Sequence, residues 1–68
     1  MQLTINGEAR EFAAALTVEL LLAELRIDGR RVALERNLEI VPRSAYSETI
    51  LADGDSVEIV QFIGGGED

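Results

Sequence analysis

One short apolar stripe at helical spacing constrains the fold of this chain more than any other feature of its sequence. The i, i+3, i+4, i+7 spacing that lines one face of an α-helix is held by Val18, Leu21, Leu22 and Leu25. Thr17 precedes the stripe and is a favourable N-cap, because its hydroxyl can accept a hydrogen bond from a free backbone N–H. Gly29 is expected to end the helix. The stripe is therefore predicted to face the core of a single small domain.

The segment before the helix alternates apolar and polar residues, which is typical of a strand. Leu3 and Ile5 alternate with polar neighbours, and Asn6-Gly7 then supplies two residues that tolerate positive φ. The sequence therefore predicts a tight hairpin whose returning strand spans residues 8–12, with Phe12 facing the core.

The segment after the helix is predicted to return to the sheet. Val32 and Leu34 indicate a third strand, with the residues between and after them pointing the other way. Residues 37–46 are predicted to be irregular, because Pro42 disfavours a central strand. Residues 50–51 are a candidate short edge strand.

A turn and a last strand complete the chain. Asp53-Gly54-Asp55 resembles the start of a calcium loop, but the glycine comes too early and the distal glutamate is missing, so a turn is favoured. Residues 57–63 form the last strand. This order predicts an α+β fold of the β-grasp (ubiquitin-like) type, a mixed four- to five-stranded sheet packed on one helix. We assign residues 1–63 to this domain and residues 64–68 to a flexible glycine-rich C-terminal tail.

The last strand is apolar on both faces, which is unusual for a small sheet covered by one helix. Val57 and Ile59 share one face and are expected to pack on the helix. The open face then carries apolar side chains, which favours docking to a partner unless the segment 37–46 folds over them. The residues expected to dock are Val60, Phe62 and Ile63.

Missing residue types exclude most catalytic chemistry. The chain has no histidine and no cysteine, so it has neither a Ser-His nor a Cys-His nucleophile pair and no thiolate metal site. We therefore expect a protein that is not an enzyme, with no catalytic residues and no metal. No apolar run is long enough to span a bilayer and no signal peptide begins at Met1, which favours the cytoplasm.

The net charge of −7 bears on possible partners. Such a chain is expected to repel nucleic acid and anionic membranes. If it docks electrostatically, its partner is expected to be basic.

Two segments carry a resemblance to a known family. The stretch DGDSVEIVQFIGGG, residues 53–66, resembles the C-terminal signature of the ThiS family, the sulfur carriers of thiamine biosynthesis. The stretch NLEIVPR, residues 37–43, resembles the mid-chain motif of that family. Chain length, the early hairpin and the position of the helix also fit, so the resemblance covers essentially the whole chain.

The resemblance implies a mechanism centred on the glycines. An E1-like adenylyltransferase activates the carboxylate of Gly66 with ATP, and a cysteine desulfurase relay supplies the sulfur that makes it a thiocarboxylate. Thiazole synthase then uses that sulfur. The carrier itself holds no permanent cofactor, since the partner enzyme uses the ATP. Gly64 and Gly65 lead to this terminus, where the absence of side chains suits entry into a narrow channel.

Glu67 and Asp68 depart from the family pattern, because such carriers end at the glycines. Trimming by a protease after Gly66 is favoured, with an inactive chain or a remnant of cloning as alternatives. Three further functions stay open: a carrier of the molybdopterin synthase small-subunit type or for another sulfur metabolite, a ubiquitin-like protein modifier, and a passive interaction module.

Overall fold

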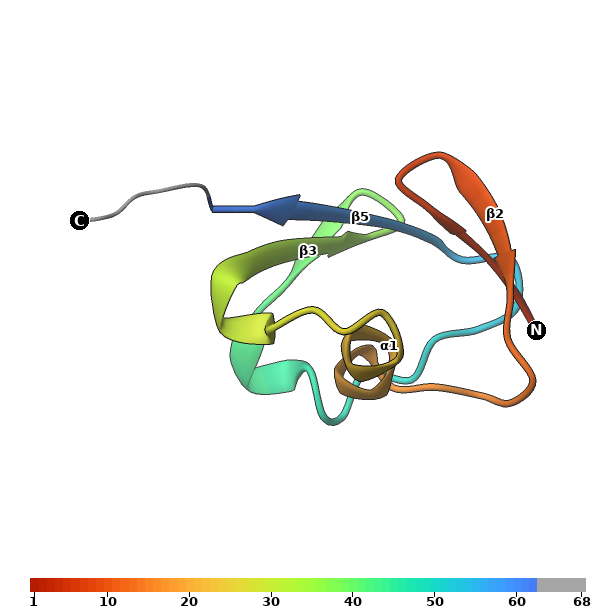
Figure 1. The fold of residues 1–68 in the computed structure, drawn as a ribbon, viewed down its shortest axis with the longest axis horizontal. Helices are drawn as coiled ribbons and strands as arrows, with labels where there is room; N and C mark the ends of the chain where they lie inside the picture. The colour runs from red at the N-terminus through yellow and green to blue at the C-terminus, as the bar shows by residue number, and fades with distance from the viewer. Residues whose placement is uncertain (63–68) are drawn as a thin grey trace.

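The computed structural model describes residues 1–62 and shows a five-stranded sheet with one α-helix packed across one face (Figure 1). The strands are β1 (Gln2–Ile5), β2 (Glu8–Glu11), β3 (Val32–Arg36), β4 (Glu39–Val41) and β5 (Ser56–Gln61), and the helix is α1 (Val18–Glu24). Their order in the sheet is β2-β1-β5-β3-β4. β1 and β5 run parallel while the other neighbours are antiparallel. The predicted α+β β-grasp fold with a mixed sheet is confirmed.

The core lies between the helix and the sheet. Three of the predicted strands each contribute two apolar residues to this core, and the helix contributes its stripe as far as Leu22. Phe12 is half-buried against this cluster, as expected. The buried hydrophobic side chains are Leu3, Ile5, Val18, Leu21, Leu22, Val32, Leu34, Tyr46, Leu51, Val57 and Ile59. None of the helices formed by the described residues is long and apolar enough to cross a membrane.

The predicted Asn6-Gly7 hairpin is present and also supports β5. Asn6 has φ 49° and Gly7 has φ 84°, the left-handed conformations that the turn requires. The side-chain oxygen of Asn6 accepts from the N–H of Ile59 at 2.7 Å, and its Nδ2 donates to the carbonyl of Ile59 at 3.2 Å. Because β1 turns away after Ile5, this side chain takes the place of a paired backbone residue beside β5.

The start of α1 follows the prediction but its end does not. The Thr17 hydroxyl accepts from the N–H of Leu20 at 3.1 Å, the expected N-cap bond. The expectation that Gly29 ends the helix is wrong: Arg26 takes the left-handed conformation, with φ 61°. The N–H of Ile27 reaches the Leu22 carbonyl at 2.9 Å, which satisfies one of the last free carbonyls and lets Ile27 pack on the core. Gly29 instead begins the short 3₁₀ helix η1 (Gly29–Arg31).

An arginine in the left-handed region leads to a stability prediction. Arg26→Gly is expected to be about 1 kcal/mol more stable than Arg26→Ala, because only glycine adopts this φ without a steric penalty from Cβ. Both variants lack the arginine side chain, so their difference isolates the backbone conformation. Urea unfolding of the two proteins measures it, and equal midpoints would show that the C-terminal turn of α1 is not strained.

The prediction of an irregular segment at 37–46 is wrong in its first part. Asn37 and Leu38 form a tight turn with φ 51° and 72°, and β4 pairs with β3 through Arg36↔Glu39 and Leu34↔Val41. β4 is an edge strand that stops before Pro42, so the proline excludes only a longer strand. A second 3₁₀ helix, η2 (Arg43–Ala45), follows.

The candidate edge strand at 50–51 is also wrong, and the turn at 53–55 is confirmed. Ile50 instead forms an isolated bridge with Thr17, while Leu51 is buried in the core. The turn has Gly54 at φ 91°, and the N–H of Asp55 donates to the carbonyl of Ala52 at 3.0 Å.

Asp55 is a buried polar residue at the edge of the core, with 8% of its surface exposed. Its carboxylate accepts from Arg36 Nε at 3.0 Å, from Asn37 Nδ2 at 3.1 Å and from the Ala52 N–H at 2.8 Å. Burial acts to raise the pKa of Asp55, but the hydrogen bonds from Ala52 and Asn37 and the charge of Arg36 outweigh it and lower that pKa. One carboxylate therefore ties the β3–β4 turn to the loop that starts β5.

Candidate functional site

The strand β5 is the last element before the glycines in the sequence. It pairs with β3 along its length up to Val32↔Gln61, and the N–H of Phe62 donates to the carbonyl of Arg31 at 2.9 Å. The sheet thus holds the chain as far as Phe62. The predicted site residues Ile63, Gly64, Gly65 and Gly66, and the proposed boundary between domain and tail, lie outside the described residues.

The predicted alternation along β5 is confirmed. Val57 and Ile59 are buried beneath α1, whereas 59% of Val60 and 57% of Phe62 is exposed on the opposite face. The segment 37–46 therefore does not bury them. Two large apolar side chains face outward in the last residues before the tail, which is the arrangement expected of a contact surface.

A third exposed residue extends this surface, and the sequence did not indicate it. Ile40 on β4 is 72% exposed and lies opposite Glu35, which itself lies opposite Glu58 on β5. Since directly paired residues share a face, Ile40 is on the same side of the sheet as Val60 and Phe62. We call these three residues the open-face patch. Ile40 was missed because a turn with Leu38 in a left-handed conformation has no clear sequence signal.

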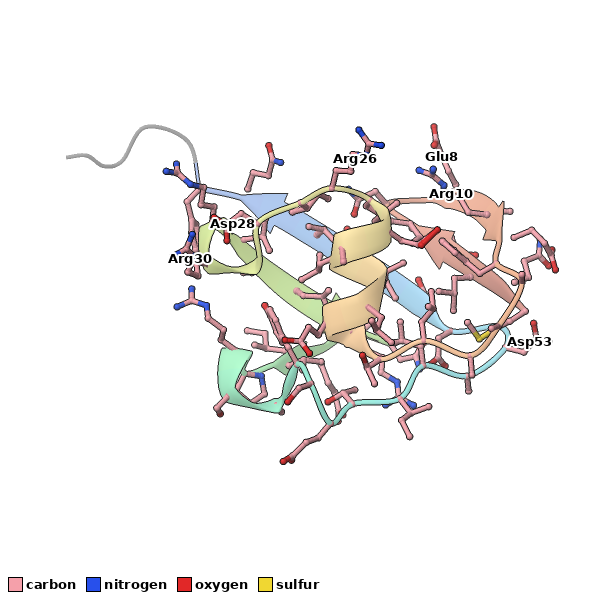
Figure 2. The ribbon with its side chains drawn as sticks, turned by 60° about the horizontal axis from the view of Figure 1, so that its bottom comes forward. Glu8, Arg10, Arg26, Asp28, Arg30 and Asp53 are labelled. Carbon is pink, nitrogen blue, oxygen red and sulfur yellow. The ribbon has the colours of Figure 1, made fainter. Side chains whose placement is uncertain are left out.

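Charged residues surround the point where β5 ends. Asp28 accepts from Arg30 Nε at 3.1 Å and from Arg30 Nη2 at 3.0 Å, a two-bond ion pair near the end of β5 (Figure 2). The hydrogen bonds from Arg30 lower the pKa of Asp28 to about 2. Within residues 1–62, no three acidic, histidine or cysteine side chains gather to hold a metal ion. In the described part of the chain, the site is therefore an outward-facing surface beside the end of β5.

A match to a family model identifies the group of proteins to which this chain is related. The ThiS family model matches residues 3–66, from β1 to the last of the three glycines. The chain belongs to the ThiS family. The resemblance seen in its two motifs is thereby confirmed, and the match ends at Gly66, before Glu67 and Asp68.

Relatives and a solved structure agree with this ThiS-family assignment. The chain is 39% identical to the sulfur carrier protein ThiS of Escherichia coli, over 97% of this chain and 100% of that protein. A crystal structure of the thiamine biosynthesis protein ThiS from Geobacter metallireducens superimposes with a TM-score of 0.85 at 39% identity, covering 97% of this chain and 100% of the other.

A longer protein is also similar. The chain is 62% identical to a thiazole synthase of Paramagnetospirillum magneticum over all 68 residues, but it spans only 21% of the length of that protein. A ThiS-family domain thus matches a small part of a polypeptide that is named for a thiazole-forming enzyme.

Proposed function

We propose that this chain carries sulfur for thiazole formation in thiamine biosynthesis, as a thiocarboxylate on Gly66. The observation that supports it most is the family match, which runs from β1 to Gly66 on a domain whose last strand leads directly towards the glycines. The similarity to sulfur carriers supports the same function.

The proposed chemistry explains why the chain needs no catalytic side chain of its own. A free carboxylate is a poor electrophile, so an E1-like adenylyltransferase first joins it to AMP from ATP. A persulfide, for which a cysteine desulfurase relay is the proposed source, then displaces AMP to give an acyl disulfide, and a thiol reduces that disulfide to the thiocarboxylate. The carrier supplies only an unhindered carboxyl carbon and a surface by which the enzymes hold it.

A free carboxylate at Gly66 requires that the bond between Gly66 and Glu67 be cut, since Glu67 follows in this sequence. We propose a protease that cleaves there. Thiazole synthase is the proposed acceptor of the sulfur, and the similarity to the longer thiazole synthase supports an association between the two.

The open-face patch is the proposed docking surface for the adenylating enzyme. Phe62→Asp is expected to weaken that complex by roughly 30-fold or more, because exposed aromatic residues commonly dominate interface energy and a charge cannot enter an apolar pocket unpaired. Ile50→Asp is the matched control, since Ile50 is 63% exposed but bridges Thr17 rather than lying on the sheet. Titration by isothermal calorimetry gives both affinities. Equal weakening by both variants would contradict docking at the patch.

Reconstitution tests the proposed function. The chain ending at Gly66 is incubated with the E1-like enzyme of its own organism, ATP, a cysteine desulfurase and cysteine, and its mass is measured. We expect replacement of one oxygen by sulfur in an ATP-dependent manner. Attachment of the chain to lysines of other proteins, without a thiocarboxylate, would instead identify a protein modifier. If neither product forms, the chain is a passive interaction module.

A further inference from the structure

Charge is distributed unevenly over this acidic protein. Arg30 and Arg31 lie in η1, immediately before β3, and the carbonyl of Arg31 accepts from the N–H of Phe62. Arg43 begins η2 and its Nη2 donates to the carbonyl of Arg30 at 3.3 Å. Three of the six arginines therefore lie beside the end of β5, and we call Arg30, Arg31 and Arg43 the arginine collar.

The collar is only partly neutralised. The Asp28 carboxylate accepts three hydrogen bonds from Arg30, one from its backbone N–H and two from its guanidinium, whereas its closest approach to the Arg31 guanidinium is 3.9 Å. The side chain of Arg31 is 81% exposed, and Arg43 forms no ion pair with any residue of the described part of the chain. Of the three collar charges, those of Arg31 and Arg43 are therefore the most available to a partner.

Many acidic residues lie towards the other end of the sheet. Figure 2 shows Asp28 and Arg30 at the end where β5 terminates, and Glu8 and Asp53 at the opposite end. The strand pairings agree, since acidic residues lie near the start of β5, in β2, and in the turns around them. The acids placed in this way are Glu8, Glu11, Glu35, Glu39, Asp53 and Asp55. The chain is negative overall but locally positive where the tail begins.

We propose that the arginine collar docks against a rim of carboxylates around the opening through which the adenylating enzyme receives the tail. This inference rests on the proposed function. The net charge of the chain led us to expect a basic partner, but at this end of the molecule the proposed partner surface is acidic. The hollow beside the collar is lined by Glu19 and Asp28 as well as by Arg30 and Arg43, so its charges offset one another and it does not form a phosphate pocket. The proposed complement is therefore an acidic protein surface that meets the exposed guanidinium groups of the collar.

The physical benefit of such a rim is orientation. The negative body is repelled by the carboxylates while the collar is attracted, so the domain approaches with the tail end first. Charge complementarity of this kind raises the association rate more than the lifetime of the complex, which suits a carrier that must be loaded and then released.

Association rates of the chain ending at Gly66, the form that the adenylating enzyme is proposed to receive, test the inference. Stopped-flow measurements at low and high salt compare the wild-type chain with Arg31→Glu, Arg43→Glu and the matched control Arg10→Glu, an exposed β2 residue outside the collar. We expect either collar variant to associate roughly 10-fold more slowly at low salt, with a smaller effect at high salt. Arg31→Gln, which removes the charge without reversing it, is expected to give a smaller loss in the same direction.

The outcomes separate this inference from the function on which it rests. If the wild-type chain binds and the collar variants lose no more than Arg10→Glu, the collar inference is overturned while the carrier function stands. If the wild-type chain does not bind the adenylating enzyme at all, both are overturned. Circular dichroism of each variant confirms that a slower rate comes from a folded protein.

Discussion

Replacing Gly65 with valine, in a chain that ends at Gly66, is expected to slow thiocarboxylate formation by roughly 100-fold or more. A β-branched side chain next to the reacting residue adds bulk and restricts the backbone, so the carboxylate oxygen no longer reaches the position for attack on the α-phosphorus of ATP. Gly65 follows β5, which ends at Gln61, and the buried core side chains of residues 1–62 come from positions 3 to 59. The effect is therefore expected on loading and not on folding.

Single-turnover loading measured by mass spectrometry gives this rate, and urea unfolding gives the stability of the same preparation. Ala13→Val is the matched control, because it introduces the same side chain at an exposed loop position before the helix. We expect wild-type loading for the control and wild-type stability for both variants. Normal loading of Gly65→Val would mean that the glycines are not selected for passage into an active site.

Replacing Asp55 with alanine is expected to lower the free energy of unfolding by roughly 2–4 kcal/mol, the largest stability effect we anticipate. The variant leaves three donors, on Arg36, Asn37 and Ala52, without their shared acceptor at a site that is largely inaccessible to water. A domain this small has only a few kcal/mol to lose, so the variant is expected to be partly unfolded at 37 °C.

Urea unfolding checks this value, with Glu58→Ala as the control. Glu58 is an exposed acid on the same region of β5, and its removal is expected to change stability by no more than about 0.5 kcal/mol. Equal effects of the two substitutions would show that the bonds of Asp55 contribute no more than a surface charge does.

The same carboxylate gives the protein an acid dependence of defined sign. The pKa of Asp55 is lowered in the folded state, so its stabilising effect is complete above the unfolded value of about 3.9 and is lost as pH falls through the lower, folded value. Asp28 acts in the same direction, with its pKa lowered to about 2. Wild-type stability is therefore expected to fall below about pH 4, and Asp55→Ala to show a shallower fall there.

Local signals made much of the fold predictable. The hairpin follows from two residues that tolerate positive φ, and the helix start follows from Thr17 and the stripe behind it. The outward-facing Val60 and Phe62 follow from the period of two along β5. Each of these features depends on residues that are close in sequence, which is why the sequence alone indicates them.

The features that the sequence did not predict depend either on residues other than glycine in left-handed conformations or on contacts between distant segments. Arg26 and Leu38 take left-handed conformations without a glycine signal, so the end of α1 and the strand β4 were both missed. Asn6 reaches Ile59, and Asp55 reaches Arg36, only because the sheet brings them together. The arginine collar likewise combines η1 with η2, and an overall charge of −7 gave no indication of it.

The central claim is that the compact domain serves to present the carboxyl group of Gly66 for loading with sulfur. Intact-mass measurement of the chain isolated from its own host, grown under thiamine limitation, tests this most directly. We expect a form that ends at Gly66 and carries sulfur in place of one carboxyl oxygen. Thiamine synthesis at the normal rate in cells where every form of the chain retains Glu67 and Asp68 would contradict the claim.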